Sequence, residues 1–475
     1  MQKKPPMLKS FVRTIDFTKE VAYTPNDDFI ISTLNIQPDF IDSISVSKSN
    51  GVLHIYVTLK PDNPTCPFCG SSTKIKGYSM YSYNHLDIAG IPSIIHWRRR
   101  RYVCKDCGKT FSETSPFGPE GFHQSYAVLN QVAIELHNIH STYKDIAHRF
   151  HVSDTIVQLY ADSFIQVPRL PLPENLGIDE ISSSMAKYGG AYLCVFVDNN
   201  GRMLNEILPN RSKHTLSRYF ESIPIEERNN VKYVTIDMWE PYKDVCRKYL
   251  KHCEISVDSF HVIEHLTAAF TRLRVDIMNQ CVYNSPNYYL LKTWHKLLES
   301  DKYDLDGEPR YNSKFKQELN YRDLLNMTLA ISPTLKTAYE LKEMYRDFNK
   351  NCTFDKAEEQ LNQLIELFEE ANLSCYSEFI SLLKHWKPEI INSFRRPYES
   401  RRQSNALAEN MNEKLKEMIN ISNGCSNFER FRARSIYCLN DKLFYGLVYS
   451  LSSNKRKGKK RGKYNKQHSS NNSNH

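Results

Sequence analysis

Alternating hydrophobic and polar residues predict β-strands in the first quarter of the chain. Over residues 51–60 every second residue is aliphatic, which is the period of a strand with one buried face. Residues 79–86 and 94–103 are strand-like in the same way. Residues 1–28 show no strong periodicity and are expected to form a loose arm.

Helical periodicity replaces this pattern over residues 125–165. A first amphipathic segment covers residues 128–139. It is followed by Ser141 and Thr142, either of which could cap a second helix, with Asp145 near the third helical position. We therefore predict a group of short helices rather than one long helix.

A break at residues 151–153 precedes another helical stretch, and this spacing fits a helix-turn-helix. The second helix of such a motif lies in the major groove of DNA, so Asp154, Thr155 and Gln158 would lie nearest the bases. Any tight pair of helices can give a similar pattern, so the alternative of simple helix packing stays open.

Residues 168–173 contain three prolines and read as a linker, because proline cannot continue a helix. After it the pattern changes to strands and helices of an α/β core with a mixed sheet. The expected strands are Ile178–Ile181, Ala191–Val197, Met203–Leu208, Val231–Ile236 and Glu254–Val257, with helices over Thr215–Ile223 and from Pro241.

Residues 262–404 are expected to form a helical insertion into this core, since residues 361–368 have helical spacing. After the insertion, Asn405, Glu409 and Asn412 fall at i, i+4 and i+7 and so share one helix face.

Composition sets broad limits on the protein. At 475 residues, 40% hydrophobic and 25% charged, the chain is expected to form several globular domains. It has no apolar run of about 18 residues and no apolar N-terminal signal, which favours a cytoplasmic protein without a membrane span. Its 12 cysteines are then better read as thiols or metal ligands than as disulfides.

The net charge of +9 comes almost entirely from the C-terminal end. Residues 454–475 contain eight Lys or Arg and no acid, which leaves the rest of the chain close to neutral. We expect this basic tail to be disordered and to attract nucleic acid phosphates, although it could equally serve solubility alone.

Two Cys-x-x-Cys-Gly pairs, formed by Cys66, Cys69, Cys104 and Cys107, predict a structural zinc site. The alternative is four unrelated buried thiols, which the repeated Cys-Gly ending disfavours. The run Arg98, Arg99, Arg100 and Arg101 leads into the second pair. These arginines could contact the DNA backbone, although a solvated charged strand would look the same.

Two acids follow or end predicted strands and a third lies on a predicted helix: Asp179, Asp237 and Glu409. Neighbouring central strands would bring the two aspartates together, and bound Mg²⁺ would offset their repulsion. Asp258 with His261 is a rival pair, interpreted as supporting the metal ligands or contacting DNA. Glu180 points to the other face of its strand and is interpreted as structural.

The order of these elements, with the first Asp on the first strand and the second Asp ending the fourth, resembles the ribonuclease-H-like core of DDE transposases. Within that class the chain is similar to the ISL-three insertion-sequence family. The similarity rests on the zinc ribbon, the helix-turn-helix, the helical insertion and four motifs. These motifs are Gly177-Ile178-Asp179-Glu180, Thr235-Ile236-Asp237-Met238-Trp239-Glu240-Pro241-Tyr242, Asp258-Ser259-Phe260-His261, and Asn405 through Glu409, Asn410, Asn412 and Lys414 to Lys416.

The resemblance implies that Asp179, Asp237 and Glu409 are catalytic and hold two Mg²⁺ or Mn²⁺ ions. Lys414 and Lys416 could reach phosphates nearby. The implied reaction is cleavage at terminal inverted repeats followed by strand transfer into target DNA, by a homodimer or larger assembly. Two alternatives stay open: a DNA-binding regulator with a silent core, and a nuclease that does not join.

The expected organisation is a multidomain α+β protein associated with the bacterial chromosome in the cytoplasm. The expected segments are an arm with strands (1–60), a zinc ribbon (61–120), a helix-turn-helix (121–167), a linker (168–176), the first part of the core (177–261), the helical insertion (262–404), the core C-terminal helices (405–450) and the disordered basic tail (451–475).

Overall fold

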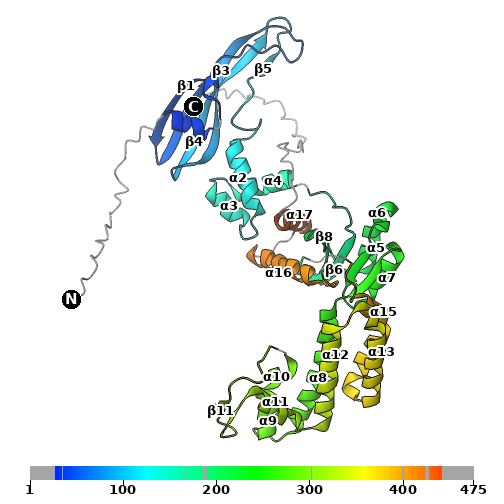
Figure 1. The fold of residues 1–475 in the computed structure, drawn as a ribbon. Helices are drawn as coiled ribbons and strands as arrows, with labels where there is room; N and C mark the ends of the chain where they lie inside the picture. Colours follow the sequence, from blue (N-terminus) through cyan, green and yellow to red (C-terminus); the bar gives the residue numbers. More distant parts are fainter. Residues whose placement is uncertain are drawn as a thin grey trace, which may run out of the picture. The chain divides into compact units, whose positions relative to one another are not determined.

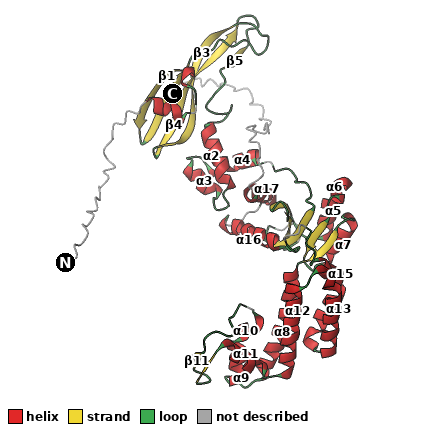
Figure 2. Cartoon of the chain, in the orientation of Figure 1, coloured by secondary structure: helices red, strands yellow, loops and turns green. Residues whose placement is uncertain are grey.

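The computed structural model describes residues 27–34, 36–165, 167–185, 190–300, 302–397, 401–422 and 427–440 (Figures 1 and 2). These residues divide into two compact units, one described as far as Phe164 and the other beginning at Ile165. The predicted basic tail and most of the predicted N-terminal arm lie outside the described residues.

The first unit is built on a five-stranded sheet of order β1-β2-β4-β3, with β5 paired to β4. Its strands are β1 (Ile41–Ser49), β2 (Val52–Leu59), β3 (Thr73–Ile88), β4 (Ile91–Cys104) and β5 (Thr110–Ser112). The alternation predicted for β2 is confirmed, because Leu53, Ile55, Val57 and Leu59 are buried and the residues between them are not. Strand β1 was not predicted, and it pairs antiparallel to β2.

One face of this sheet carries the hydrophobic core of the unit. Trp97 on β4 is fully buried there beside Ile55 of β2 and Phe117. Helix α1 (Asp27–Thr33) adds Ile30 and the residue after the helix adds Leu34. Burial of these large side chains is the main stabilising contribution in this unit.

Three helices follow the sheet: α2 (Tyr126–His137), α3 (Tyr143–Arg149) and α4 (Asp154–Phe164). They confirm the helical segments expected over residues 125–165. Thr142 rather than Ser141 is the N-cap of α3, and it forms a capping box with Asp145. Between α3 and α4, the backbone N–H of Val152 donates a hydrogen bond to the carbonyl of Ala147.

The second unit contains a mixed five-stranded sheet of order β10-β9-β6-β7-β8. Its strands are β6 (Asn175–Ser182), β7 (Tyr192–Asp198), β8 (Met203–Leu208), β9 (Tyr233–Ile236) and β10 (Glu254–Val257). Strands β6, β7 and β8 are mutually antiparallel, whereas β9 and β10 run parallel to β6. All five strands were predicted from the sequence pattern.

Helices α5 (Lys213–Glu221) and α7 (Glu240–Tyr249) connect these strands as expected, and Pro241 lies in the first turn of α7. A short helix, α6 (Ile225–Asn229), was not predicted.

The predicted insertion is mainly helical, and its first helix begins directly after β10 at Ser259. Its helices are α8 (Ser259–Gln280), α9 (Pro286–Thr293), α10 (His295–Glu299), α11 (Tyr321–Leu329), α12 (Pro333–Asn351), α13 (Phe354–Ala371), α14 (Ser377–His385) and α15 (Lys387–Asn392). It also contains an unpredicted hairpin, β11 (Arg310–Asn312) with β12 (Gln317–Leu319).

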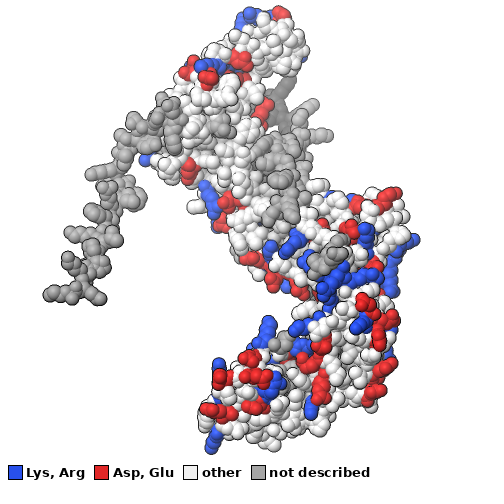
Figure 3. Space-filling view, viewed as in Figure 1, with Lys and Arg blue, Asp and Glu red and all other residues white. Residues whose placement is uncertain are grey.

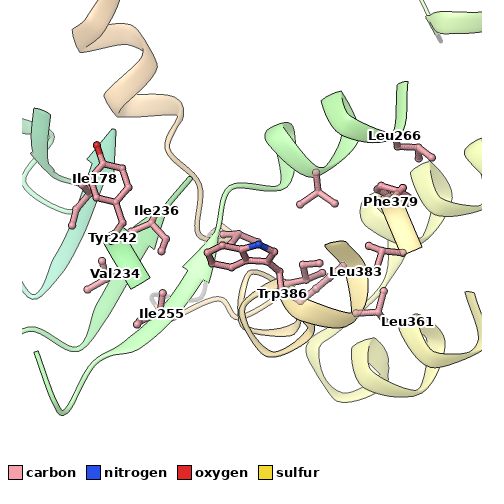
Figure 4. Packing of buried hydrophobic residues seen from close by; sticks show 14 of the residues in the cluster. Ile178, Val234, Ile236, Tyr242, Ile255, Leu266, Leu361, Phe379, Leu383 and Trp386 are labelled. Carbon is pink, nitrogen blue, oxygen red and sulfur yellow. The ribbon is translucent and has the colours of Figure 1, made fainter. Parts of the chain in front are cut away.

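The insertion and the sheet share one hydrophobic core. Figure 4 shows Ile236 and Ile255 of the sheet near Trp386, with Leu266 and Phe379 on the helical side. Continuous packing of this kind holds the insertion rigidly to the strands.

Two final helices complete the second unit: α16 (Ala406–Ile421), which packs against β6 and β7, and α17 (Phe428–Leu439), which packs against β8. No helix within the described ranges is both long enough and apolar enough to span a membrane.

Candidate functional sites

The four predicted zinc ligands converge in the first unit. The Sγ atoms of Cys66 and Cys107 are 3.7 Å apart and those of Cys69 and Cys104 are 3.4 Å apart. Thiolates bound to one tetrahedral Zn²⁺ at about 2.3 Å are separated by roughly 3.8 Å, so the cluster has the dimensions of a zinc site.

Backbone geometry supports the same conclusion. The glycines that follow the two cysteine pairs, Gly70 and Gly108, have φ values of 77° and 70°, a left-handed conformation that favours glycine. The N–H groups of Asp106 and Cys107 lie 3.4 Å from the Cys104 sulfur and donate to it. A hydrogen bond from the backbone of Ser71 lowers the pKa of Cys69 to about 6, whereas burial and the neighbouring thiols raise the pKa of Cys107 to about 12, so without metal the cluster shares its protons unequally.

In the second unit, the sheet register brings Asp179 and Asp237 together. Strands β6 and β9 are parallel neighbours with Gly177 opposite Thr235, so the two aspartates follow at equivalent positions. Ligand atoms of Asp179, Asp237 and His261 all lie within 4.8 Å of one another. Asp179 is only 6% exposed.

Electrostatics in this cluster favour a cation. Burial, followed by the charge of Asp237, raises the pKa of Asp179 to about 7. The hydrogen bond with Asp237 raises the pKa of His261 to about 9, and the two side chains lie 2.9 Å apart. A proton on Asp179 and a charged imidazole therefore offset the carboxylates.

A second group of ligands adjoins the first through the same histidine. Ligand atoms of Asp258, His261 and Glu409 lie within 4.8 Å of one another. Burial, followed by Asp258, raises the pKa of Glu409. The candidate acids from β6, the end of β9 and α16 thus gather around one imidazole.

The oxygens of Asp258 are engaged by two backbone amides. Oδ1 accepts from the N–H of Phe260 and Oδ2 accepts from the N–H of Asn405, both at 3.1 Å. Asp258 is 3% exposed and so ties the start of α8 to the start of α16. Since α16 carries Glu409, this contact helps to fix the position of the Glu409 backbone.

The two predicted asparagines both reach β6. Asn405 is the N-cap residue of α16, and its Nδ2 donates to the carbonyl of Ile178 at 3.0 Å. Asn412 Nδ2 donates to Asp179 Oδ2 at 2.8 Å. The buried Asn412 Oδ1 has no hydrogen-bond partner among the described residues. This unpaired oxygen beside Asp179 fits a site built for a hard cation.

Glu180, interpreted from its strand position as structural, is held by two neighbouring side chains. It pairs with Arg211 and accepts a hydrogen bond of 3.1 Å from Tyr242. The Arg211 guanidinium also lies 4.2 Å from the Tyr192 ring and 4.6 Å from the Trp239 ring.

Sequence reasoning missed Arg211, and it also missed Gln403. The Oε1 atom of Gln403 accepts from Thr235 on β9 and from Ser256 on β10. Nothing in the local pattern around Gln403 signals this contact, since its partners lie about 150 residues away in the chain.

The arginines predicted to contact DNA differ in exposure. Arg98 and Arg101 are exposed, and Arg98 lies over the Tyr78 ring at 4.2 Å. Arg100 corrects the prediction: it is 3% exposed and its guanidinium is bound by Glu113 at 2.8 Å and by backbone carbonyls. Arg100 therefore supports the sheet and is not available to phosphate.

The remaining residues that were predicted to contact DNA are half-buried or exposed. Arg99 is half-buried and donates to the carbonyl of Glu113. In α4 Thr155 is exposed and Gln158 is half-buried, and in α16 Lys416 is exposed and Lys414 is half-buried.

Comparison with known proteins gives two family matches and one relative. Residues 176–435 match the transposase family of the DDE type named ISL3 (ISL-three), and residues 62–107 match the zinc-finger of the transposases IS204/IS1001/IS1096/IS1165. The chain is similar to the transposase for insertion sequence element IS1001 of Bordetella parapertussis. The two are 23% identical over 387 residues, which cover 80% of this chain and 89% of the relative.

Proposed function

Since the chain belongs to the ISL3 family of DDE transposases, we propose that it binds the terminal inverted repeats of an insertion sequence and catalyses cleavage and strand transfer there. The observation that carries the proposal is the convergence of Asp179, Asp237 and Glu409 around His261. Three segments far apart in sequence bring one buried and two half-buried acids together here, an arrangement typical of a metal-binding catalytic site.

The order of the second-unit sheet supports a ribonuclease-H-like core for this reaction. Asp179, Asp237 and Glu409 would hold two Mg²⁺ or Mn²⁺ ions, which when bound supply activation of the attacking hydroxyl and stabilisation of the leaving oxygen. Asn412 orients Asp179 by its 2.8 Å hydrogen bond. His261, which lies 2.9 Å from Asp237 in the same cluster, would help to balance its charge.

We propose that the first unit binds the DNA specifically. Helices α3 and α4 would act as a helix-turn-helix, with Thr155 and Gln158 of α4 facing the bases. Arg98 and Arg101 of β4, the strand that ends at the zinc ligand Cys104, would contact the DNA backbone and set the register. Two DNA ends must meet before strand transfer, so at least two copies of the chain would act together.

Cleavage of a labelled duplex carrying the end of the element tests this function. We expect Mg²⁺-dependent nicking by the wild type, no nicking by Asp237→Asn, and unchanged DNA binding by that variant. Asp244→Asn is the matched control, because Asp244 lies on α7 in the same unit and its exposed carboxylate pairs with Lys213.

Each alternative function has its own outcome in this assay. Binding without nicking by the wild type in Mg²⁺ or Mn²⁺ would instead indicate a regulator. Nicking without covalently joined target DNA would indicate a nuclease that does not join.

A further inference from the structure

A basic cavity of about 520 Å³ lies beside the candidate active site in the second unit. Three arginines line it: Arg202, Arg401 and Arg402. None of the lining residues that the structure describes is acidic. Figure 3 shows Lys and Arg side chains gathered on the visible face of the second unit around its sheet. A cavity whose described wall consists mainly of cations and amides is suited to an anion.

The three arginines are not equivalent. Arg402 is committed to the fold, since it donates to Ser393 and Asn349 and lies 3.9 Å from the Phe394 ring. Arg401 makes one hydrogen bond to the described residues, from Nη2 to the carbonyl of Asn199 at 2.9 Å, so among these residues most of its donors have no partner. Arg202 is exposed and makes no hydrogen bond or ion pair with the described residues. Arg401 and Arg202 can therefore bind a ligand.

Two further groups in the wall also favour an anion. Ala406 and Leu407 belong to the first turn of α16, a 16-residue helix whose N-cap side chain is turned away to β6 and makes no cap hydrogen bond. The first-turn amides thus have no side-chain cap, and the carboxylate already at this end of the helix, Asp258, is bonded to the N–H of Asn405 instead. Gln403 is 5% exposed, and its Nε2 has no partner among the described residues.

The cavity and the candidate active site share α16. Ala406 lines the cavity, and Glu409 follows three residues later on the same helix, on a neighbouring part of its surface and less than one turn of about 5.4 Å away along the axis. Asn405, which lies between Gln403 and this first turn, is bonded to Asp258. An anion in the cavity would therefore lie within a few nucleotides of the reacting phosphate.

We propose that this cavity binds a backbone phosphate of the DNA strand that flanks the cleavage position, held by Arg202, Arg401 and the first turn of α16. The proposal rests on the proposed function, and it names the contact that holds the DNA strand in register next to the acids. Its energetic role is positioning: the bound phosphate fixes the strand without reading its sequence.

The test measures binding of the full chain to a duplex carrying the element's end, in EDTA, over a series of salt concentrations. Removing one phosphate contact lowers the slope of log K against log salt by about 0.9. We expect that change in Arg202→Ala/Arg401→Ala, with binding at low salt weaker by roughly tenfold or more. Arg202→Lys/Arg401→Lys should recover much of the slope. Arg310→Ala, an exposed arginine on β11, is the control elsewhere in the unit.

A scan of neutral methylphosphonates, one phosphate at a time around the cleavage position, then locates the contact. In the wild type one position should lose affinity, and in the double alanine variant that position should become silent. An unchanged slope, or a loss spread evenly over all positions, overturns the proposal.

Competition with inorganic phosphate separates a DNA site from a site for free phosphate. If inorganic phosphate weakens DNA binding equally in the wild type and in the double alanine variant, the proposal is supported. If millimolar phosphate displaces DNA from the wild type alone, the proposal is overturned. If the wild type neither binds nor cuts the duplex, the proposed function fails and this inference with it. If it binds and cuts while the alanine variants behave as wild type, only the inference fails.

Discussion

At the scale of single residues, Asp179 is the group whose charge state the fold disturbs most clearly. Its pKa is about 7 in the folded chain against an ordinary value of 3.8, chiefly because it is buried. The folded protein therefore holds a proton that the unfolded chain releases. The contribution of Asp179 to the free energy of unfolding is therefore highest below pH 4 and falls as the pH rises to 7.

Replacing Asp179 by Asn should remove this pH dependence. In EDTA, Asp179→Asn is expected to be more stable than the wild type at pH 8, and the difference should shrink at pH 4.5. The gain is at most about 4 kcal/mol, from roughly three pKa units at 1.36 kcal/mol each. Chemical denaturation at both pH values measures it, with Asp244→Asn as control. An equal difference at pH 4.5 and pH 8 would contradict the assignment.

Asp258 offers a second prediction at this scale. An Asn at this position keeps one acceptor oxygen but turns an NH₂ toward the other backbone amide, so either the start of α8 or the start of α16 loses its partner. We expect Asp258→Asn to lower kcat for cleavage by roughly 10- to 100-fold with little change in KM for DNA. Steady-state cleavage kinetics measure this split. A rise in KM at constant kcat would instead make Asp258 a DNA contact.

At the scale of elements, the zinc site secures the end of a long hairpin in which one of the two strands buries little. Strands β3 and β4 pair from Thr73 and Cys104 onward, and the first half of β3 is mostly exposed, whereas β4 has buried residues such as Tyr102. Because β3 contributes so little buried surface, this end of the hairpin is expected to depend on the metal to hold its shape.

Removing one zinc ligand should therefore loosen this end alone. We expect Cys104→Ser to lose the bound zinc and to show faster amide exchange over residues 62–112, while the second unit keeps its protection. Metal analysis and hydrogen exchange measure both effects, with Cys352→Ser as a control thiol in the second unit. Unchanged amide exchange near the two Cys-x-x-Cys pairs would mean that strand pairing alone holds this end of the hairpin.

The elements also show how far sequence pattern reaches. Strand alternation and proline positions located β2, all five strands of the second sheet and the start of α7. The pattern failed where elements are very short, as in α6 and the β11–β12 hairpin, and also in the nine-residue β1, whose register is irregular between Ile41 and Ser43. Three- to five-residue segments do not complete a period of either kind, so their structure is decided by packing.

The site follows the same division. Asp179, Asp237 and Glu409 could be named because each sits in a recognisable strand or helix context. Gln403 and Arg401 could not, since both act through contacts with residues about 150 to 200 positions away. Arg100 was wrongly predicted to contact DNA because the sequence does not show whether an arginine is buried or exposed.

At the scale of the whole molecule, the candidate chemistry lies in one unit and the proposed specific grip lies in the other. The two activities should therefore separate by mutation. In Thr155→Ala/Gln158→Ala the proposed base contacts are lost while the acids are untouched. The preference for the element's end over an unrelated duplex should fall by at least tenfold, because a good base contact contributes about 1–3 kcal/mol. Mg²⁺-dependent nicking of unrelated DNA at high protein concentration should persist.

Asp237→Asn should show the reverse, with preference for the element's end retained and nicking lost from both duplexes. Competition binding and nicking assays on the same two DNAs measure the four quantities together. If the α4 variant loses nicking of unrelated DNA as strongly as it loses preference, the first unit must also act on the chemical step. The division of labour between the units would then be wrong, even though each site is correctly located.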